Sequence, residues 1–116
     1  MANHLTCTWT GASGRKYIYD VHARRPTLTL KAGGNFIYAR MDEQRRWVPV
    51  LIGHGDLLQR AAAESSRLEC VDTKGATHVH VHVNADRDRR LAEEHDLLEN
   101  FPQALHPDGC NKLDGG

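Results

Sequence analysis

The stretch Phe36–Gly53 (FIYARMDEQRRWVPVLIG) determines the fold that we predict for this chain. It holds two runs of β-branched and aromatic residues, Phe36–Ala39 and Trp47–Ile52, separated by a polar segment. Runs of this composition favour extended strands, and a short polar turn between them is typical of antiparallel neighbours. We therefore predict a β-hairpin over residues 36–52. Pro49 should lie at a bulge or on an unpaired side, because proline has no backbone N–H to donate.

Further strands are predicted on both sides of this hairpin. Tyr17–Val21 is aromatic and β-branched, and Thr77–Val83 (THVHVHV) alternates strictly, which is the pattern of a strand. Residues 1–14 are rich in Thr, Gly and Ser, and we interpret them as a loose N-terminal arm.

Two main helices complete the prediction. The first covers about 57–69, because Asp56 is a favourable N-cap and the apolar residues behind it form one stripe. The second covers roughly 86–100 and ends before Pro102. This order of elements predicts an α+β fold, with a small antiparallel or mixed sheet of three to four strands flanked by two main helices. Residues 15–116 then form a single domain.

The composition is that of a globular domain with balanced charge. Of the 116 residues, 40% are hydrophobic and 26% are charged, and 15 Lys and Arg match 15 Asp and Glu. This balance excludes a polybasic domain that coats nucleic acid nonspecifically. The first 60 residues nevertheless hold nine basic and four acidic side chains, so this half is where a basic face would lie.

Location and redox state are predicted from what the sequence lacks. No apolar run is long enough to span a bilayer, and the first residues lack the basic start and apolar stretch of a signal peptide. We therefore expect a cytoplasmic protein without membrane contacts. The odd number and wide spacing of Cys7, Cys70 and Cys110 argue against a disulfide framework and a CxxC metal site.

Three residues stand out chemically before any family is considered. Tyr38 lies late on a predicted strand, Arg60 lies on the first turn of the following helix, and Glu94 lies on the stripe of the last helix that should face the core. A buried carboxylate is costly unless a cation, a metal or hydrogen-bond donors satisfy it. The alternative for Glu94 is an ion pair with Arg90, one helical turn earlier.

Five segments, in this order, resemble the motifs of the GIY-YIG nuclease family. They are Phe36-Ile37-Tyr38, Leu51-Ile52-Gly53, Asp56-Leu57-Leu58-Gln59-Arg60, Glu94-His95-Asp96-Leu97-Leu98, and Asn111 after Pro107. The resemblance covers residues 35–111, about two-thirds of the chain. The chain departs from the family pattern at Leu51, which stands in place of the YIG tyrosine, and at Phe36, which replaces the first glycine of GIY.

The resemblance implies an endonuclease that hydrolyses phosphodiester bonds of nucleic acid, DNA above all, with one divalent Mg²⁺ or Mn²⁺ ion. Glu94 would bind this ion, which keeps most of its waters. Arg60 would contact the phosphate with its permanently charged guanidinium. Tyr38 would orient or deprotonate the attacking water.

Further residues are candidates for substrate binding. They are His54, beside Gly53, the terminal Asn111, and Arg45 and Arg46 of the basic first half, to which Arg24 and Arg25 also belong. The sequence contains no zinc finger, helix-turn-helix or basic tail. A homodimer or a targeting partner is therefore an expected source of specificity.

Other functions are open at this point. One is a noncatalytic binding module on the same scaffold. His78, His80 and His82 project from one strand face and resemble the histidine-triad motif of nucleotide hydrolases. They could also share a zinc ion with a further ligand such as His95 or His106. The remaining interpretation places the intervening valines in the core and the histidines half-exposed or under a helix.

Overall fold

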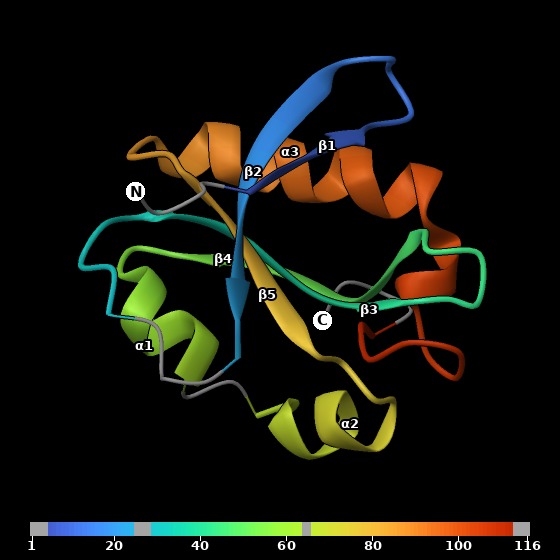
Figure 1. Cartoon of the computed structure of the whole chain (residues 1–116). Coiled ribbons are helices and arrows are strands. Elements are labelled where there is room, and N and C mark those ends of the chain that lie inside the picture. Colours follow the sequence, from blue (N-terminus) through green and yellow to red (C-terminus); the bar gives the residue numbers. More distant parts are fainter. Residues whose placement is uncertain (1–4, 25–28, 64–65, 113–116) are drawn as a thin grey trace.

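The structure is a computed structural model that describes residues 5–24, 29–63 and 66–112. Its α+β fold is built on one five-stranded sheet with the strand order β1-β2-β5-β3-β4, in which all neighbouring strands are antiparallel. The strands are β1 (Thr6–Thr10), β2 (Lys16–Ala23), β3 (Gly34–Met41), β4 (Trp47–Gly55) and β5 (His78–Val83). The sheet twists strongly, so that β2 crosses the direction of β3 and β4 steeply (Figure 1).

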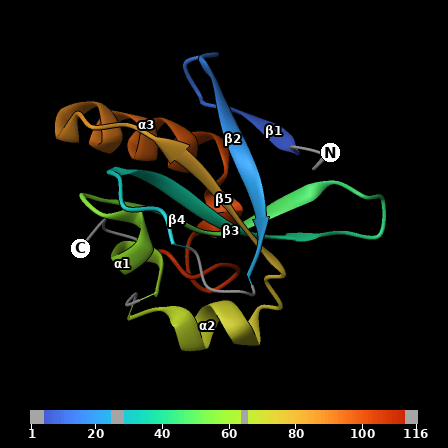
Figure 2. The ribbon, with the colours of Figure 1, turned by 60° about the vertical axis from the view of Figure 1, so that its left-hand side comes forward.

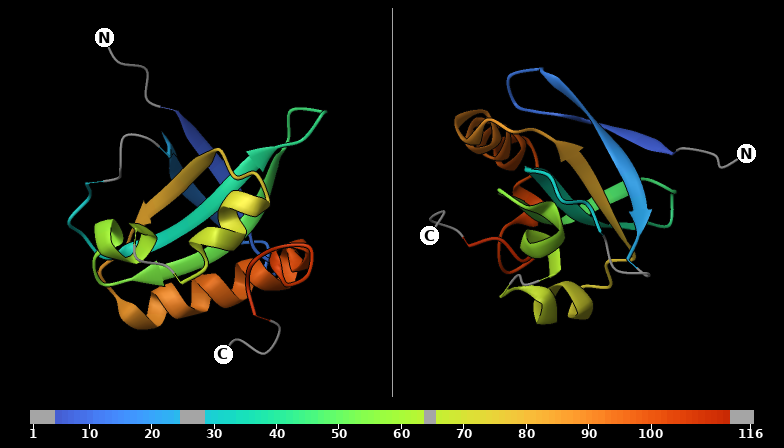
Figure 3. Two further views of the ribbon diagram at one scale, coloured as in Figure 1. Left: turned by 90° about the horizontal axis from the view of Figure 1, so that it is seen from below. Right: turned by 90° about the vertical axis from the view of Figure 1, so that its left-hand side faces the viewer.

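Helices cover both faces of the sheet. They are α1 (Leu58–Ala63), α2 (Leu68–Thr73), α3 (Arg87–Asn100) and the short 3₁₀ helix η1 (Pro102–Ala104). One hydrophobic cluster joins α1 and α2 to the valines of β5, and a second joins α3 and η1 to the opposite face. Figure 2 shows α3 above the sheet with α1 and α2 below it, and both panels of Figure 3 show the same division. In the described part of the chain, no helix is long and apolar enough to cross a membrane.

The predicted hairpin is confirmed as β3 and β4. The register shifts at its middle, where Tyr38 faces Leu51 but Ala39 faces Pro49, so one extra residue bulges from β4. Pro49 therefore lies beside the bulge, on a strand at the edge of the sheet, as the missing N–H requires. The strands expected at Tyr17–Val21 and Thr77–Val83 are likewise confirmed as β2 and β5.

The loose N-terminal arm is wrong for residues 6–10, which form β1 and pair with β2. The cause is a tertiary contact that composition does not reveal. Trp9 is only 3% exposed, and its indole N–H donates to Nδ1 of His80 at 3.0 Å. Alternate threonines also suit an extended strand. Residues 1–4 lie outside the described part of the chain.

The single helix expected over 57–69 is two short helices, α1 and α2. Leu58 and Val71 both enter the core beneath the sheet, yet 13 residues of straight helix would put them on nearly opposite sides. A change in chain direction between α1 and α2 allows both side chains to be buried. The first free N–H groups of α1 are satisfied by the carbonyls of Ala32 and Leu30, so Asp56 is not needed as a cap.

The last helix agrees with the prediction within one residue. α3 begins after Asp86, whose carboxylate accepts a hydrogen bond from the backbone N–H of Arg89 at 3.1 Å. This is a side-chain N-cap. Pro102 follows the helix and opens η1.

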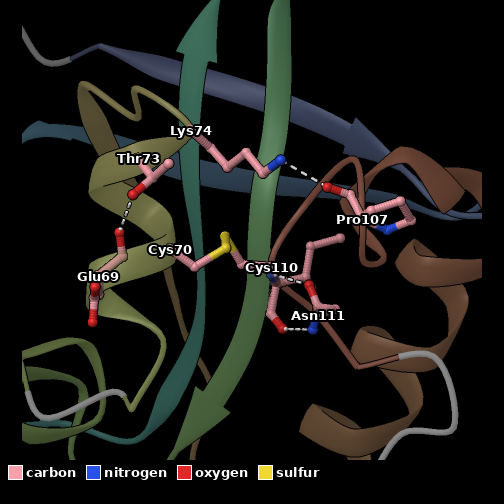
Figure 4. The surroundings of a disulfide bond; sticks show 8 residues. Glu69, Cys70, Thr73, Lys74, Pro107, Cys110 and Asn111 are labelled. Atoms are coloured by element: carbon pink, nitrogen blue, oxygen red, sulfur yellow. Dashed lines mark hydrogen bonds between the residues drawn. A yellow bond between two sulfur atoms is a disulfide. The ribbon is translucent and has the colours of Figure 1, made fainter.

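The cysteine count and spacing argue against a disulfide framework, but the structure holds one disulfide, in which Cys70 of α2 is bonded to Cys110 across 40 residues. Their Cα atoms lie 5.9 Å apart, and Cys7 remains free. Figure 4 shows that the bond ties α2 to the C-terminal segment, where Lys74 also donates to the carbonyl of Pro107 at 2.7 Å. An odd count leaves one cysteine over, but it does not exclude a pair that the fold brings together.

Removing this bond will destabilise the protein. The double variant Cys70→Ser, Cys110→Ser should lose about 3 kcal/mol of unfolding free energy, because the bond restricts a 40-residue loop in the unfolded chain. Urea denaturation measures this loss, and Cys7→Ser is the matched control that should stay within about 0.5 kcal/mol of wild type. Equal stability of wild type and double variant would mean that the bond does not form in solution.

Candidate functional site

The C-terminal segment lies along the free edge of β4. The N–H of Cys110 donates to the carbonyl of Val50 at 2.8 Å. The carboxamide of Asn111 then bonds both the N–H and the carbonyl of Ile52, each at 2.8 Å. The side chain of Asn111, which Figure 4 shows next to the disulfide, thus satisfies the backbone hydrogen-bonding groups of Ile52 at the strand edge.

A cavity of about 450 Å³ opens at this edge. It is lined by residues from six separate parts of the chain, among them Phe36, Gly53, His54, Glu94 and Asn111. Apolar walls come from side chains of β3, β4 and α3, namely Phe36, Leu51, Ile52 and Leu98. Four of the five segments singled out by the motif resemblance therefore meet at one cavity, although up to 75 residues separate them along the chain.

Glu94 is the acidic group of this cavity. Its side chain is 22% exposed, and its Oε2 lies 3.8 Å from Nε2 of His54. Burial raises the pKa of Glu94, and His95 offsets only part of this rise. A cation in the cavity would favour the ionised carboxylate, because an opposite charge stabilises the charged form.

The buried carboxylate expected at position 94 lies instead at Glu93, which is 3% exposed. One residue corresponds to about 100° around a helix, so this shift turns Glu94 from the core toward the cavity. The alternative for Glu94, an ion pair with Arg90, is not what the structure shows. Arg90 instead pairs with Asp56 and donates to the carbonyls of Asn84 and Ala85.

His54 faces Glu94 in a defined tautomer. Its Nδ1 accepts from Nε–H of Arg90 at 3.5 Å, so in the neutral ring Nε2 carries the proton. Burial lowers the pKa of His54, and the charges of Arg90 and Arg87 lower it further. At neutral pH the ring is therefore a neutral hydrogen-bond donor directed at the carboxylate side of the cavity.

Tyr38 is not brought to this cavity. It is buried, its hydroxyl donates to the carbonyl of Ala62 at 2.8 Å, and the guanidinium of Arg24 lies 5.2 Å from the ring centre. Burial raises the pKa of the phenol, although the charge of Arg24 opposes this. A phenol with such a pKa stays protonated at neutral pH and does not act as a base.

The expected basic residues are also distributed differently. Arg60 is exposed on α1 and is not among the lining residues, whereas Arg67 and Lys112 are. Sequence reasoning missed these two, because neither belongs to a recognisable motif. Arg67 precedes α2, and Lys112 follows the segment that the disulfide ties back.

The arginines of the hairpin turn lie far from the cavity. Arg45 and Arg46 are exposed between β3 and β4, and Arg46 pairs with Asp42 at 3.2 Å. His54 is at the other end of the same strands, about 20 Å away at the usual rise per residue. Of the remaining pair in the basic half, Arg24 bonds Asp72 at 2.6 Å, and Arg25 lies outside the described residues.

The interpretation that places the valines of the histidine strand in the core is confirmed for Val79 and Val81 and is wrong for Val83, which is 51% exposed. Val79 and Val81 enter the cluster beneath α1 and α2, while the three histidines face the other side. His80 is fully buried, with Trp9 on Nδ1 and the ring of Trp47 4.6 Å away. The enclosed His80 cannot serve as the nucleophile of the histidine-triad alternative, which leaves His82, whose side chain is 32% exposed. Across the described ranges, no group of three His, Cys, Asp or Glu is placed to hold a metal.

The burial of His80 predicts how stability depends on pH. Burial lowers its pKa to about 4, with His78 and His22 adding to the shift. The unfolded chain takes up the proton near pH 6.5 but the folded chain does not, so stability should fall by about 3 kcal/mol between pH 6.5 and 4. Urea denaturation at a series of pH values measures this, with His80→Asn as the variant that keeps an acceptor for Trp9. The same decline in the variant would show that other groups cause it.

Comparisons with known proteins add nothing to this geometry. A search of protein families, of curated proteins and of solved structures returned no significant match to the chain. The site is therefore interpreted from its residues and from the motif resemblance alone.

Proposed function

We propose that the chain is a divalent-metal-dependent nuclease of the GIY-YIG type, which hydrolyses phosphodiester bonds of nucleic acid, DNA above all. The cavity at the free edge of β4 is its proposed active site. The observation that supports this most is the meeting of Phe36, Gly53, Glu94 and Asn111, each from a different motif segment, around that cavity.

The donor set of the cavity fits the expected Mg²⁺ or Mn²⁺ ion. Glu94 would hold it, and a single carboxylate suits these ions because they keep several of their waters. Such an ion offsets charge on the phosphate and the leaving oxygen. Asn111 does not compete for it, because its carboxamide is engaged by Ile52.

The chain's own groups divide the remaining tasks. The Nε2–H of His54 orients a water or a phosphate oxygen beside Glu94. Arg67 and Lys112 bring positive charge to the cavity for a phosphate. Phe36 and Leu51 form part of its apolar wall.

Tyr38 and Arg60 act from outside the cavity in this proposal. Tyr38 holds α1 in place through the carbonyl of Ala62. Arg60 offers an exposed charge on α1 to the nucleic acid. The exposed Arg45 and Arg46 are available for a distant stretch of the same nucleic acid.

The proposal is tested by cleavage of a substrate panel. Supercoiled plasmid, linear duplex DNA, single-stranded DNA and RNA are incubated with Mg²⁺, with Mn²⁺ or with EDTA. We expect nicking of at least the plasmid with either metal and none with EDTA. Cleavage that persists in EDTA, or intact substrates in every arm, would overturn the proposal.

A noncatalytic binding module is the second candidate. Leu51 removes one hydroxyl from the cavity, and the Tyr38 hydroxyl is occupied by Ala62, which are the observations that favour it. Fluorescence anisotropy with a labelled duplex separates the two. Tight binding in Mg²⁺ with the duplex left intact would select the binding module.

We also propose a cytoplasmic location, and a dimer or a targeting partner as the source of specificity. The Cys70–Cys110 disulfide weighs against a reducing compartment, because structural disulfides persist mainly in oxidising ones. Thiol alkylation in intact cells before lysis distinguishes a reducing compartment from an oxidising one. Three labelled cysteines would indicate a reducing compartment, and labelling of Cys7 alone an oxidising one.

A further inference from the structure

A second polar cluster lies between α3 and the sheet, at the end of β5. The carboxylate of Glu93 is buried, accepts from the hydroxyl of Tyr19 and lies 3.0 Å from Nδ1 of His82. The motif resemblance did not single out this cluster. The only sequence signal for this cluster is the alternation of histidines and valines in β5, which places His82 on the face opposite the valines.

The proton positions in this cluster follow from its chemistry. Burial and the charge of Glu93 raise the pKa of Tyr19 well above its usual value, so the phenol stays a donor. Nδ1 of His82 lies 3.0 Å from both carboxylate oxygens of Glu93, and a carboxylate only accepts, so a proton on Nδ1 would be directed at Glu93. The second ring nitrogen, Nε2, has no hydrogen-bond partner among the residues that the structure describes.

The exposed side of His82 faces a cavity of about 410 Å³. This cavity lies between β2, the end of β5 and the first half of α3, and is lined by Arg15, Tyr17, His82, Asn84, Arg89, Ala92 and Glu93. The described lining has no residue in common with the cavity at β4. Arg15 and Arg89 bring two guanidinium groups to it, and the Arg89 side chain is 82% exposed.

We propose that this cavity binds a phosphate group, with His82 donating from Nε2 and with Arg15 and Arg89 as charged partners. The guanidinium fork matches the oxygens of a phosphate. The Glu93 carboxylate behind the ring balances the charge of an imidazolium, which donates from both nitrogens. Glu93 is thus a positioning residue. The phosphate belongs either to a small phosphorylated molecule or to a nucleic-acid backbone.

The test follows the histidine rings by NMR in ¹⁵N-labelled protein. Inorganic phosphate, a nucleoside monophosphate and a short DNA duplex are titrated separately in the presence of EDTA, so that the outcome does not depend on the proposed nuclease. We expect a probe to shift the Nε2 signal of His82. Shifts with all three probes assign a small phosphorylated ligand, and shifts with the duplex alone assign a backbone phosphate. If no probe moves His82, the proposal is wrong.

Exposed arginines give the matched variants. The double variant Arg15→Ala, Arg89→Ala should weaken phosphate binding by roughly tenfold or more, as expected for lost charge-assisted bonds. Arg87→Ala removes one exposed charge from the same helix without touching the cavity, and should change binding by less than about twofold. If Arg87→Ala weakens phosphate binding equally, the loss reflects the general charge of the protein, and the proposed site is wrong.

Glu93→Gln tests the positioning role. Glutamine can still accept from Tyr19, but its amide N–H would now face Nδ1 of His82. The neutral ring should then carry its proton on Nε2, which the ¹⁵N shifts of the ring report. Phosphate binding should weaken, because the imidazolium loses the carboxylate that balances its charge. An unchanged tautomer would contradict the role given to Glu93.

Discussion

Replacing Glu94 by glutamine will abolish metal-dependent nicking of supercoiled plasmid, with a rate loss on the order of 100-fold or more. The substitution keeps the size of the side chain but removes the carboxylate that the proposed Mg²⁺ or Mn²⁺ ion requires. The fold should be unaffected, because burial already disfavours the charged form of Glu94. Initial nicking rates at saturating metal, with circular dichroism as the check on folding, measure the effect.

The matched control is Glu99→Gln on the same helix. Glu99 is exposed and does not line the cavity at β4, so this variant should nick at the wild-type rate. If Glu94→Gln still nicks the plasmid, the nuclease active site does not lie at this cavity. A loss of equal size in both variants would point to the general charge of α3.

Replacing Arg90 by alanine will destabilise the protein by about 4 kcal/mol, because buried hydrogen bonds of the guanidinium are lost and a cavity opens. The side chain is 2% exposed and donates to the carbonyls of Asn84 and Ala85, each at 3.0 Å. It also pairs with Asp56 and contacts His54. Alanine would leave two carbonyls without their donor and a hole between β5 and α3.

The neighbouring Arg89→Ala is the control for this prediction. Its side chain is 82% exposed, and its distance of 3.9 Å to Asp86 makes a weak surface pair. Urea denaturation should place this variant within about 0.5 kcal/mol of wild type. Similar unfolding free energies for both variants would show that Arg90 does not support the connection between β5 and α3.

Local patterns predicted the elements that local interactions determine. The β3–β4 hairpin, the alternating strand β5 and the capped helix α3 follow from residues within a few positions of one another. Pro49 even indicated the bulge, because a missing N–H restricts where the residue can pair.

The elements that differ depend on distant partners. β1 is ordered by Trp9 on His80, 71 residues away, and the disulfide joins residues 40 apart. The break between α1 and α2 follows from the burial of Val71 below the same sheet as Leu58. No window of sequence contains these contacts.

Motif order predicted which residues the structure brings to one cavity, but it did not predict the direction of every side chain. Glu94, His54 and Asn111 all line one cavity, in accordance with the motif order. The hydroxyl of Tyr38 instead bonds Ala62, and Arg60 points to solvent. Side-chain direction follows from helix rotation and packing, which motif spacing leaves undetermined.

The most direct test of the central claim is Mn²⁺ binding followed by amide NMR of the wild-type protein. A paramagnetic ion broadens the signals nearest to it. The proposed active site predicts selective loss of the Gly53, His54 and Glu94 signals at low Mn²⁺, reversed by EDTA and absent in Glu94→Gln. Broadening centred elsewhere, such as the histidines of β5, or no selective broadening at all would contradict a metal-dependent active site at the edge of β4.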